Sequence, residues 1–171
     1  LSLEQRKKVD ETNDCEFYST PKFVYHLDSN FRKNLTQLYK NEIQNNCTVL
    51  DLMSSWDSYL PKDKNYKKII GHGLNRKELD KNKVLENYWI QNFNVDQEIP
   101  LQDESIDYCL MVAGWQYLQY PEKISEEISR ILNKNGKFII SFSNRAFWHK
   151  SPNIWTYSTE AERIEYVRSI L

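Results

Sequence analysis

The chain has 171 residues, of which 40% are apolar and 13% aromatic, so its composition excludes a disordered protein and allows one domain with a hydrophobic core. No apolar run approaches the roughly 20 residues that a membrane-spanning helix needs. A formal net charge of −1 excludes a general attraction to nucleic acid or to an anionic membrane surface.

The three cysteines are scattered, and none lies in a Cys-x-x-Cys or Cys/His pattern with metal-ligand spacing. We therefore expect no metal site, and we expect a soluble intracellular protein in a reducing compartment, either cytoplasm or an organelle interior. The chain opens with neither a start methionine nor a signal peptide, which indicates a processed or trimmed form.

The first 14 residues are polar and charged, and they predict an N-terminal arm that is mobile or forms a surface helix. Residues 15–171 predict a single domain. Residues 27–44 carry apolar side chains at helical spacing, so they predict an amphipathic helix. Residues 48–53 predict a buried strand, which contains a carboxylate, Asp51, close to its end.

Beyond this strand, short apolar segments alternate with helical ones. Strands are predicted at residues 68–71, 88–91, 106–113 and 137–142. Helices are predicted at 75–79, near 84–85, from Pro121 to a stop at Asn135 and Gly136, and at 158–171 with Ile164, Val167, Ile170 and Leu171 facing inward. Such alternation implies an α/β fold with a mainly parallel sheet that has helices on both faces.

Four segments appear in the order and at the spacing of a known family. They are 49–52 (VLDL), 69–71 (IIG), 99–107 (IPLQDESID) and 126–138 (EEISRILNKNGKF). Together they resemble the class I S-adenosylmethionine (SAM)-dependent methyltransferases, in particular a glycine-poor subgroup of the type 11 group. The resemblance implies a Rossmann-like fold with its cofactor half at residues 48–144, and SAM as the cofactor.

The resemblance also implies where SAM binds, namely beyond the carboxyl end of the first strand. The family has loop glycines where this chain has Met53, Ser55 and Asp57, and it has a ribose-binding acid where this chain has Gly73. The predicted cofactor-binding residues are Asp51, Met53, Ser54, Ser55, Trp56, Asn75, Asn92 and Phe93. Asp51 either orients the SAM amino group or caps the following turn, and Trp56 either walls the pocket or fills it.

Methyl transfer depends on proximity and orientation, so no catalytic signature is compulsory and the catalytic residues stay unassigned. The predicted substrate-pocket residues are Tyr18, Tyr25, Trp115, Tyr117, Asn144 and Arg145. Trp115 and Tyr117 have the alternative of packing in the core or a lid. His26 and His72 are predicted to be surface or turn residues, and Trp148 and Trp155 to pack the last helix.

The chain ends within the helix after the fifth strand, so we expect the sheet to lack the family's last two strands. The fifth strand is then an exposed apolar edge, which proteins usually cover. The natural C-terminus is missing, or a terminal segment folds over the edge, or a partner protein covers it. Two functions remain open: a SAM-dependent methyltransferase with an unknown acceptor, and a catalytically inactive methyltransferase-like domain that is a structural or binding subunit of a larger complex.

Overall fold

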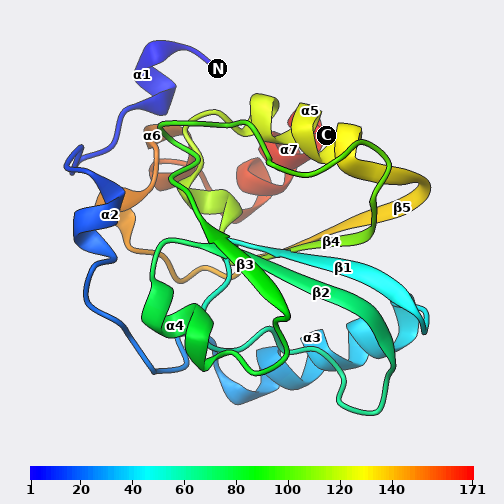
Figure 1. The fold of residues 1–171 in the computed structure, drawn as a ribbon. Coiled ribbons are helices and arrows are strands. Elements are labelled where there is room, and N and C mark those ends of the chain that lie inside the picture. The colour runs from blue at the N-terminus through cyan, green and yellow to red at the C-terminus, as the bar shows by residue number, and fades with distance from the viewer.

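The computed structural model describes residues 1–171 and has at its centre a five-stranded sheet in which all strands run parallel (Figure 1). The strands are β1 (Cys47–Leu52), β2 (Tyr66–Gly73), β3 (Asn87–Ile90), β4 (Ile106–Val112) and β5 (Leu132–Ser141). Their order is β3-β2-β1-β4-β5. The chain thus adds β2 and β3 on one side of β1 and then returns to add β4 and β5 on the other side, so the strand order reverses between β1 and β4 in the sheet. Ligands of open α/β sheets bind beside such a reversal, at the carboxyl ends of the strands. The predicted fold class is confirmed.

Helices cover both faces of this sheet (Figure 1). The α-helices are α1 (Leu3–Arg6), α2 (Asp14–Phe17), α3 (Ser29–Glu42), α4 (Arg76–Lys81), α5 (Pro121–Ile131), α6 (Asn153–Thr156) and α7 (Glu160–Ile170). Two 3₁₀ turns occur at η1 (Trp115–Tyr117) and η2 (Trp148–Lys150). None of these helices combines the length and the apolar character that crossing a membrane requires.

The core divides into two clusters because neighbouring strand residues point to opposite faces. On β1, Val49 belongs to the cluster beneath α3, whereas Leu50 belongs to the larger cluster beneath α5 and α7. Both residues are fully buried. A strand that is apolar on both faces is what a parallel sheet between two helical layers requires.

Two local predictions after β2 are wrong. Residues 83–84 form a turn instead of a short helix. Helix α5 begins at Pro121 as predicted, but it ends at Ile131, so Asn135 and Gly136 lie within β5. Gly136 has no positive φ; it is a close-approach position, since a Cβ there would lie 2.9 Å from the Asn133 carbonyl oxygen.

The last helix is present and turns part of its predicted face to the core, since Ile170 packs against the larger cluster. Thr159 and Glu162 form a capping box at its start, and Val167 is buried as predicted. The other buried residue is Tyr166, while Ile164 is 44% exposed, contrary to the prediction. Leu171 is 66% exposed, so it too does not face inward. The helix therefore docks through a narrow stripe around Tyr166 and Val167.

The N-terminal residues lie against the second half of the chain, near α5 and α6 (Figure 1). The Arg6 guanidinium donates to the Gln119 carbonyl oxygen and to the Glu122 carboxylate. Lys8 Nζ lies 2.9 Å from Asp14 Oδ2 in a buried ion pair. The Lys8 pair lies within residues 1–14, whereas the Arg6 contacts and Lys150 Nζ, 3.7 Å from Asp14 Oδ1, attach these residues to the rest of the chain. The predicted division into arm and domain stays a prediction.

Strand β5 pairs with β4 alone and has no strand on its outer side. One of its faces is covered from within the chain, because Phe142 at its end meets the buried Trp155 ring of α6 edge to face, with centroids 5.0 Å apart. Trp155 also packs against Tyr166 of the last helix, as predicted, whereas Trp148 is 60% exposed and does not. A partner protein on the outer edge of β5 remains a prediction.

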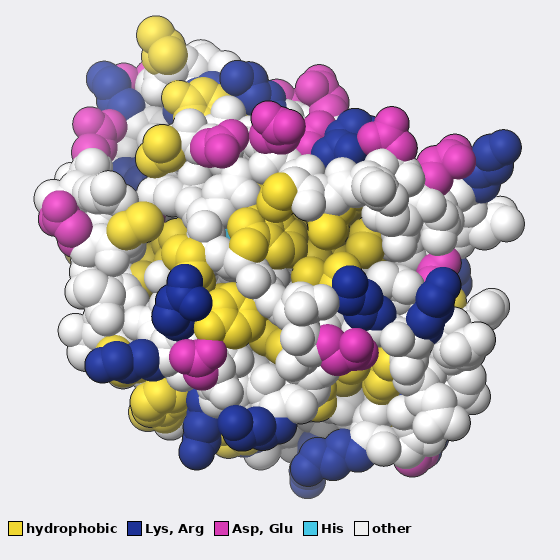
Figure 2. Space-filling model, viewed as in Figure 1, with side chains coloured by type: hydrophobic (Ala, Val, Ile, Leu, Met, Phe, Trp, Pro, Cys, Tyr) yellow, Lys and Arg dark blue, Asp and Glu magenta, His cyan; other side chains and the backbone are white.

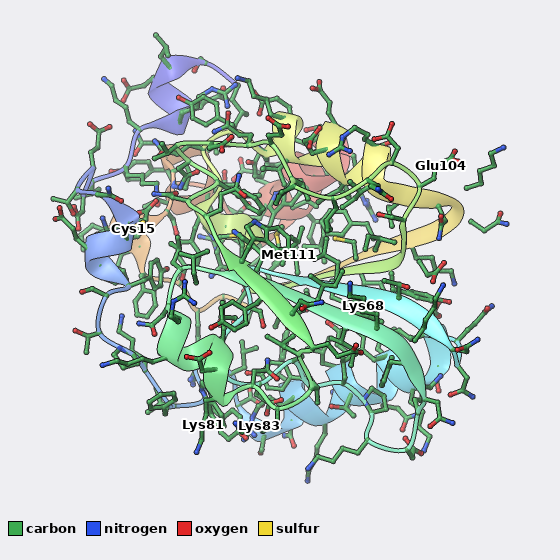
Figure 3. All side chains as sticks on the ribbon, viewed as in Figure 1. Cys15, Lys68, Lys81, Lys83, Glu104 and Met111 are labelled. Carbon is green, nitrogen blue, oxygen red and sulfur yellow. The ribbon has the colours of Figure 1, made fainter.

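Charged side chains of both signs are interspersed over the face shown in Figure 2, and apolar side chains gather near its middle, over β3. This distribution agrees with the net charge of −1 and shows no stripe of one sign on this face. All three cysteines are free: Cys15 is exposed on α2 (Figure 3), while Cys47 and Cys109 are buried.

Candidate functional site

A cavity of about 430 Å³ lies at the carboxyl ends of β1, β2 and β4, within the size range of small-molecule sites. All eight residues predicted to bind the cofactor line it, and so do four of the six predicted for the substrate: Tyr18, Tyr25, Tyr117 and Arg145. No group of three or more His, Cys, Asp or Glu side chains could hold a metal ion.

Asp51 lies at the end of β1, where it is 3% exposed and lines the cavity. Its carboxylate accepts a hydrogen bond from Ser54 Oγ at 2.6 Å. Burial raises the pKa of Asp51 to about 6, although the Ser54 and Ser58 hydroxyls oppose this shift. At neutral pH the cavity thus contains a buried, ionised carboxylate that no cation of the chain neutralises.

The first loop, residues 53–61, begins with Met53 in the left-handed region at φ 53°, a conformation that favours glycine. Its backbone N–H donates to His72 Nδ1 at 3.2 Å, and the Ser54 N–H donates to the His72 carbonyl oxygen at 2.6 Å. His72 thereby fixes the loop onto β2. Residues 53–61 contain no glycine, so Met53 itself adopts the backbone conformation that glycine favours.

The prediction that His72 is a surface or turn residue is wrong, because it is 2% exposed within β2. Burial lowers the pKa of its imidazole to about 4, so the ring is neutral at pH 7. With Nδ1 accepting from Met53, Nε2 carries the proton and donates to the Gln91 carbonyl oxygen at 2.9 Å. Phe93 stacks on this imidazole with centroids 3.9 Å apart.

Gly73 ends β2 directly beneath the first loop. A Cβ at this position would lie 2.6 Å from the Ser54 carbonyl oxygen, a contact that real Cβ atoms do not make. The loop backbone therefore occupies the space into which an acidic side chain at position 73 would project. The observed conformation of the first loop and a side chain at position 73 therefore exclude one another.

Glu78 on α4 brings a carboxylate to the same wall of the cavity, which the sequence analysis missed. Its Oε2 accepts from Ser55 Oγ at 2.5 Å, and its Oε1 accepts from the Lys22 backbone N–H at 2.6 Å. Asn75 caps α4, and Glu78 stands three residues later, in the position of a capping-box acid. That spacing was the available signal.

Residues 18–27, which we call the strap, supply part of the lining of the cavity. Asn75 Nδ2 donates to the Tyr18 carbonyl oxygen at 2.7 Å, and Trp56 Nε1 donates to the Val24 carbonyl oxygen at 3.3 Å. The Trp56 ring lies against Tyr25, with centroids 4.5 Å apart. Trp56 is thus a wall of the cavity at its rim and does not fill it.

Two predicted substrate-pocket residues lie elsewhere. Trp115 is 1% exposed in the core, because η1 turns its ring toward Phe138, at 6.2 Å between centroids. Asn144 is exposed on the segment after β5 and does not line the cavity. Beside them, Gln116 and Phe147 do line it, and no sequence pattern singled them out.

The chain is similar to a known protein family and to several solved structures. Residues 57–140 match a family described as a methyltransferase domain, and no curated protein matches the chain. A SAM-dependent methyltransferase from Aquifex aeolicus is similar over 84% of this chain and 88% of that chain, with 21% identity and a TM-score of 0.56. The family match begins just after Trp56, so it omits β1 and the start of the first loop.

Two further structures show how widely the fold is used. A putative methyltransferase of Haloferax volcanii, solved with the activator Trm112, has 21% identity and a TM-score of 0.54 over 64% of this chain and 50% of that one. The [4+2]-cyclase SpnF has 14% identity and a TM-score of 0.60 over 80% of this chain and 55% of that one. The chain thus spans about half the length of these two proteins, and at such identities the likeness establishes the fold alone.

Proposed function

Since residues 57–140 belong to the methyltransferase domain family, we propose that the chain binds SAM in this cavity and transfers its methyl group to an acceptor beneath the strap. The observation that carries the proposal is the cavity itself. About 430 Å³ is open at the reversal of strand order, with the Asp51 carboxylate inside it. Met53 and Trp56 lie in its walls and leave it open.

The groups around the cavity fit the parts of SAM. The Asp51 carboxylate suits the ammonium group, since it has no cationic partner in the chain. Ser54 and Ser55 add hydroxyls near the amino-acid end, and Phe93 gives an apolar surface for adenine. Bound SAM supplies an electrophilic methyl group.

The ribose hydroxyls need acceptors, and Gly73 offers none. Glu78 fits this role, because each of its carboxylate oxygens has one hydrogen-bond partner and keeps a free lone pair. Asn75 is less suited, since its Oδ1 accepts from the Glu78 N–H and its Nδ2 donates to the strap. We therefore assign the ribose contact to Glu78 in place of the strand-two acid.

A catalytically inactive domain that acts as a binding or structural subunit is the second candidate. The observation that favours it is the Ser54 carbonyl oxygen above Gly73, which leaves no room for the usual ribose acid. The Haloferax methyltransferase, which was solved with an activator protein, is a relative of this fold that assembles with a partner.

Calorimetric titration with SAM and S-adenosylhomocysteine (SAH) separates the two candidates. We expect a dissociation constant between about 1 μM and 1 mM, the range in which enzymes bind their substrates. Methylthioadenosine, which lacks the amino-acid end, should bind more weakly than SAH because it makes no contact with Asp51. An absence of SAM and SAH binding at millimolar ligand contradicts the enzyme proposal and supports the second candidate.

A further inference from the structure

The cavity is lined by four carboxylates, and the chain neutralises only one of them with an ion pair. Asp14 lies 2.9 Å from Lys8 Nζ. The other three form no ion pair: Asp51, Asp57 and Glu78. Asp51 ends β1, Asp57 belongs to the first loop and Glu78 belongs to α4. The side of the cavity formed by β1, β2 and the first loop is therefore negative.

Asp57 holds its carboxylate in a fixed place between the first loop and the strap. Its Oδ1 accepts a hydrogen bond from the Tyr59 backbone N–H at 2.9 Å, and its Oδ2 accepts one from Tyr25 Oη at 3.2 Å. The side chain is half-buried and lines the cavity. Neither donor is charged, so these bonds orient the negative charge of Asp57 without neutralising it.

The charge of Asp57 reaches Asp51. Burial is the main cause of the raised pKa of Asp51, and the negative charge of Asp57 adds to it, whereas no cation of the chain lowers it. Two lysine or arginine side chains line the cavity without an acid partner, but they come from the strap and from the segment after β5: Lys22 and Arg145. A cation bound at the first loop therefore meets two carboxylates that lack one.

The substrate and the product of methyl transfer differ by one charge. SAM carries an ammonium, a carboxylate and a sulfonium, whereas SAH carries a neutral thioether in place of the sulfonium. Methyl transfer forms a bond from the acceptor atom to the methyl carbon and breaks the methyl C–S bond, whose electron pair stays on sulfur. A negative surface therefore attracts SAM more strongly than SAH.

We propose that the first loop distinguishes SAM from SAH by charge, and that Asp57 is a specificity-determining residue of the cavity. The carboxylates of Asp51 and Asp57 together attract the sulfonium as well as the ammonium, so the cofactor is bound more tightly than the product. The inference rests on the proposed function. Its consequence is weak product inhibition, because the ligand loses part of this attraction when it becomes SAH.

The hydrogen bonds of the loop do not require a charge at position 57. An asparagine there has the same acceptor for the Tyr59 N–H, so the turn itself can form without a carboxylate. Asp51 suits the ammonium, and Glu78 suits the ribose hydroxyls. The negative charge of Asp57 is thus the one that neither the loop nor these two contacts need.

Three ligands test the preference in the unaltered chain: SAM, SAH and sinefungin, which has an amine in place of the S-methyl group and so keeps the positive charge. We expect calorimetry at low salt to show that SAM and sinefungin each bind about tenfold more tightly than SAH. SAH that binds as tightly as the two cationic ligands overturns the inference.

Variants of the loop then separate charge from hydrogen bonding. Asp57→Asn should lower the preference for SAM over SAH about threefold and leave SAH affinity within about twofold, which also reports that the variant is folded. Tyr25→Phe removes the hydrogen bond to Asp57 Oδ2 but keeps the carboxylate, so the preference should persist. Asp96→Asn, an exposed residue outside the cavity, is the matched control. An unchanged preference in Asp57→Asn, or an equal loss in Tyr25→Phe, shows that the charge of Asp57 does not discriminate.

Failure of the proposed function would look different. In that case the unaltered chain binds none of the three ligands at millimolar concentration. If the inference alone is wrong, all three ligands bind and SAH binds as tightly as SAM.

Discussion

The two sides of the cavity treat their polar groups in opposite ways. On the side of β1 and β2, His72 is fully hydrogen-bonded, and Asp51 and Glu78 each accept from a serine of the first loop. On the strap side, Lys22 Nζ and Gln116 Oε1 have no partner. The first side is organised by hydrogen bonds within the chain, whereas the second leaves these two groups unpaired.

The hydrogen bonds on the side of β1 and β2 explain how the first loop keeps its conformation without glycine. Met53 at φ 53° costs about 1–2 kcal/mol relative to an ordinary backbone conformation. The hydrogen bonds from Met53 and Ser54 to His72 offset that cost and fix the loop on β2. The contacts with His72 thus hold the loop in a conformation that glycine would adopt without strain. Because Gly73 has no side chain, the Ser54 carbonyl oxygen has room above it.

The largest expected effect is at Asp51. Asp51→Asn should weaken SAH binding roughly ten- to a hundredfold, because a charge-assisted hydrogen bond is lost. The same change should raise the melting temperature of the ligand-free protein at pH 7.5, since a buried carboxylate is removed. Calorimetry and thermal unfolding measure the two effects. Asp96→Asn, an exposed residue outside the cavity, is the control, and unchanged SAH affinity in Asp51→Asn would refute the assigned role.

The contact between the first loop and β2 is tested by two glycines of one strand. Gly73→Ala should destabilise the fold by about 1–3 kcal/mol and weaken SAH binding, because the new Cβ meets the Ser54 backbone oxygen. Gly71→Ala is the matched control: its Cβ meets only the end of the Leu85 side chain, which can move. Urea unfolding compares them. Equal destabilisation by both would show that the Ser54 contact is not decisive.

A third prediction concerns pH. Since the pKa of Asp51 is about 6, SAH affinity should be constant above pH 7 and fall about tenfold by pH 5, as the carboxylate takes up a proton. Asp51→Asn should show no such fall. A pH-independent affinity in the unaltered chain would mean that Asp51 does not contact the ligand.

Protein stability follows a different pH dependence from ligand affinity. The raised pKa of Asp51 favours the folded state below pH 3.8, and that contribution is lost as pH rises through about 6. His72 acts in the opposite direction: its contribution is present above pH 6.5 and is lost as pH falls toward about 4. The Asp51→Asn protein should therefore lose stability more steeply than the unaltered chain between pH 6.5 and 4.

The smallest expected effect is at Asn75, which connects the two sides. Asn75→Ala removes both the cap of α4 and the bond to the strap, and should cost about 1 kcal/mol. Asn75→Asp keeps the capping oxygen but loses the Nδ2 donor to Tyr18, so it isolates the strap contact. Hydrogen exchange of the strap amides should quicken in both variants. Unchanged exchange in Asn75→Asp would show that the strap is held by its other contacts.

The sheet was predictable because its strands are short, apolar and separated by helical patterns. The N-cap Asn75 and the first residue of α5, Pro121, could also be read from local chemistry. The failures came from tertiary context. Gly136 was taken as a helix stop, but it is needed for a close approach within β5, and Ile164 turned outward because α7 docks through Tyr166.

The lining of the candidate site was predictable where it depends on strand ends, since parallel strands bring their carboxyl ends together. The residues missed come from segments whose positions depend on long-range contacts. Lys22 lies on the strap, which is held by Glu78 and Asn75 from 50 or more residues away. Gln116 was missed and Trp115 misplaced because both lie in a single 3₁₀ turn, which directs Trp115 into the core and places Gln116 beside the cavity.

The central claim is that SAM binds against the glycine-free first loop. Titration of ¹⁵N-labelled protein with SAH, followed by backbone amide chemical shifts, tests it most directly. We predict the largest shifts at Ser54 and Ser55 in the first loop, at Gly73 on β2 and at Ala113 after β4, all at the carboxyl ends of the strands. Saturating SAH that leaves these amides unshifted, or shifts only residues away from the cavity, would contradict the account.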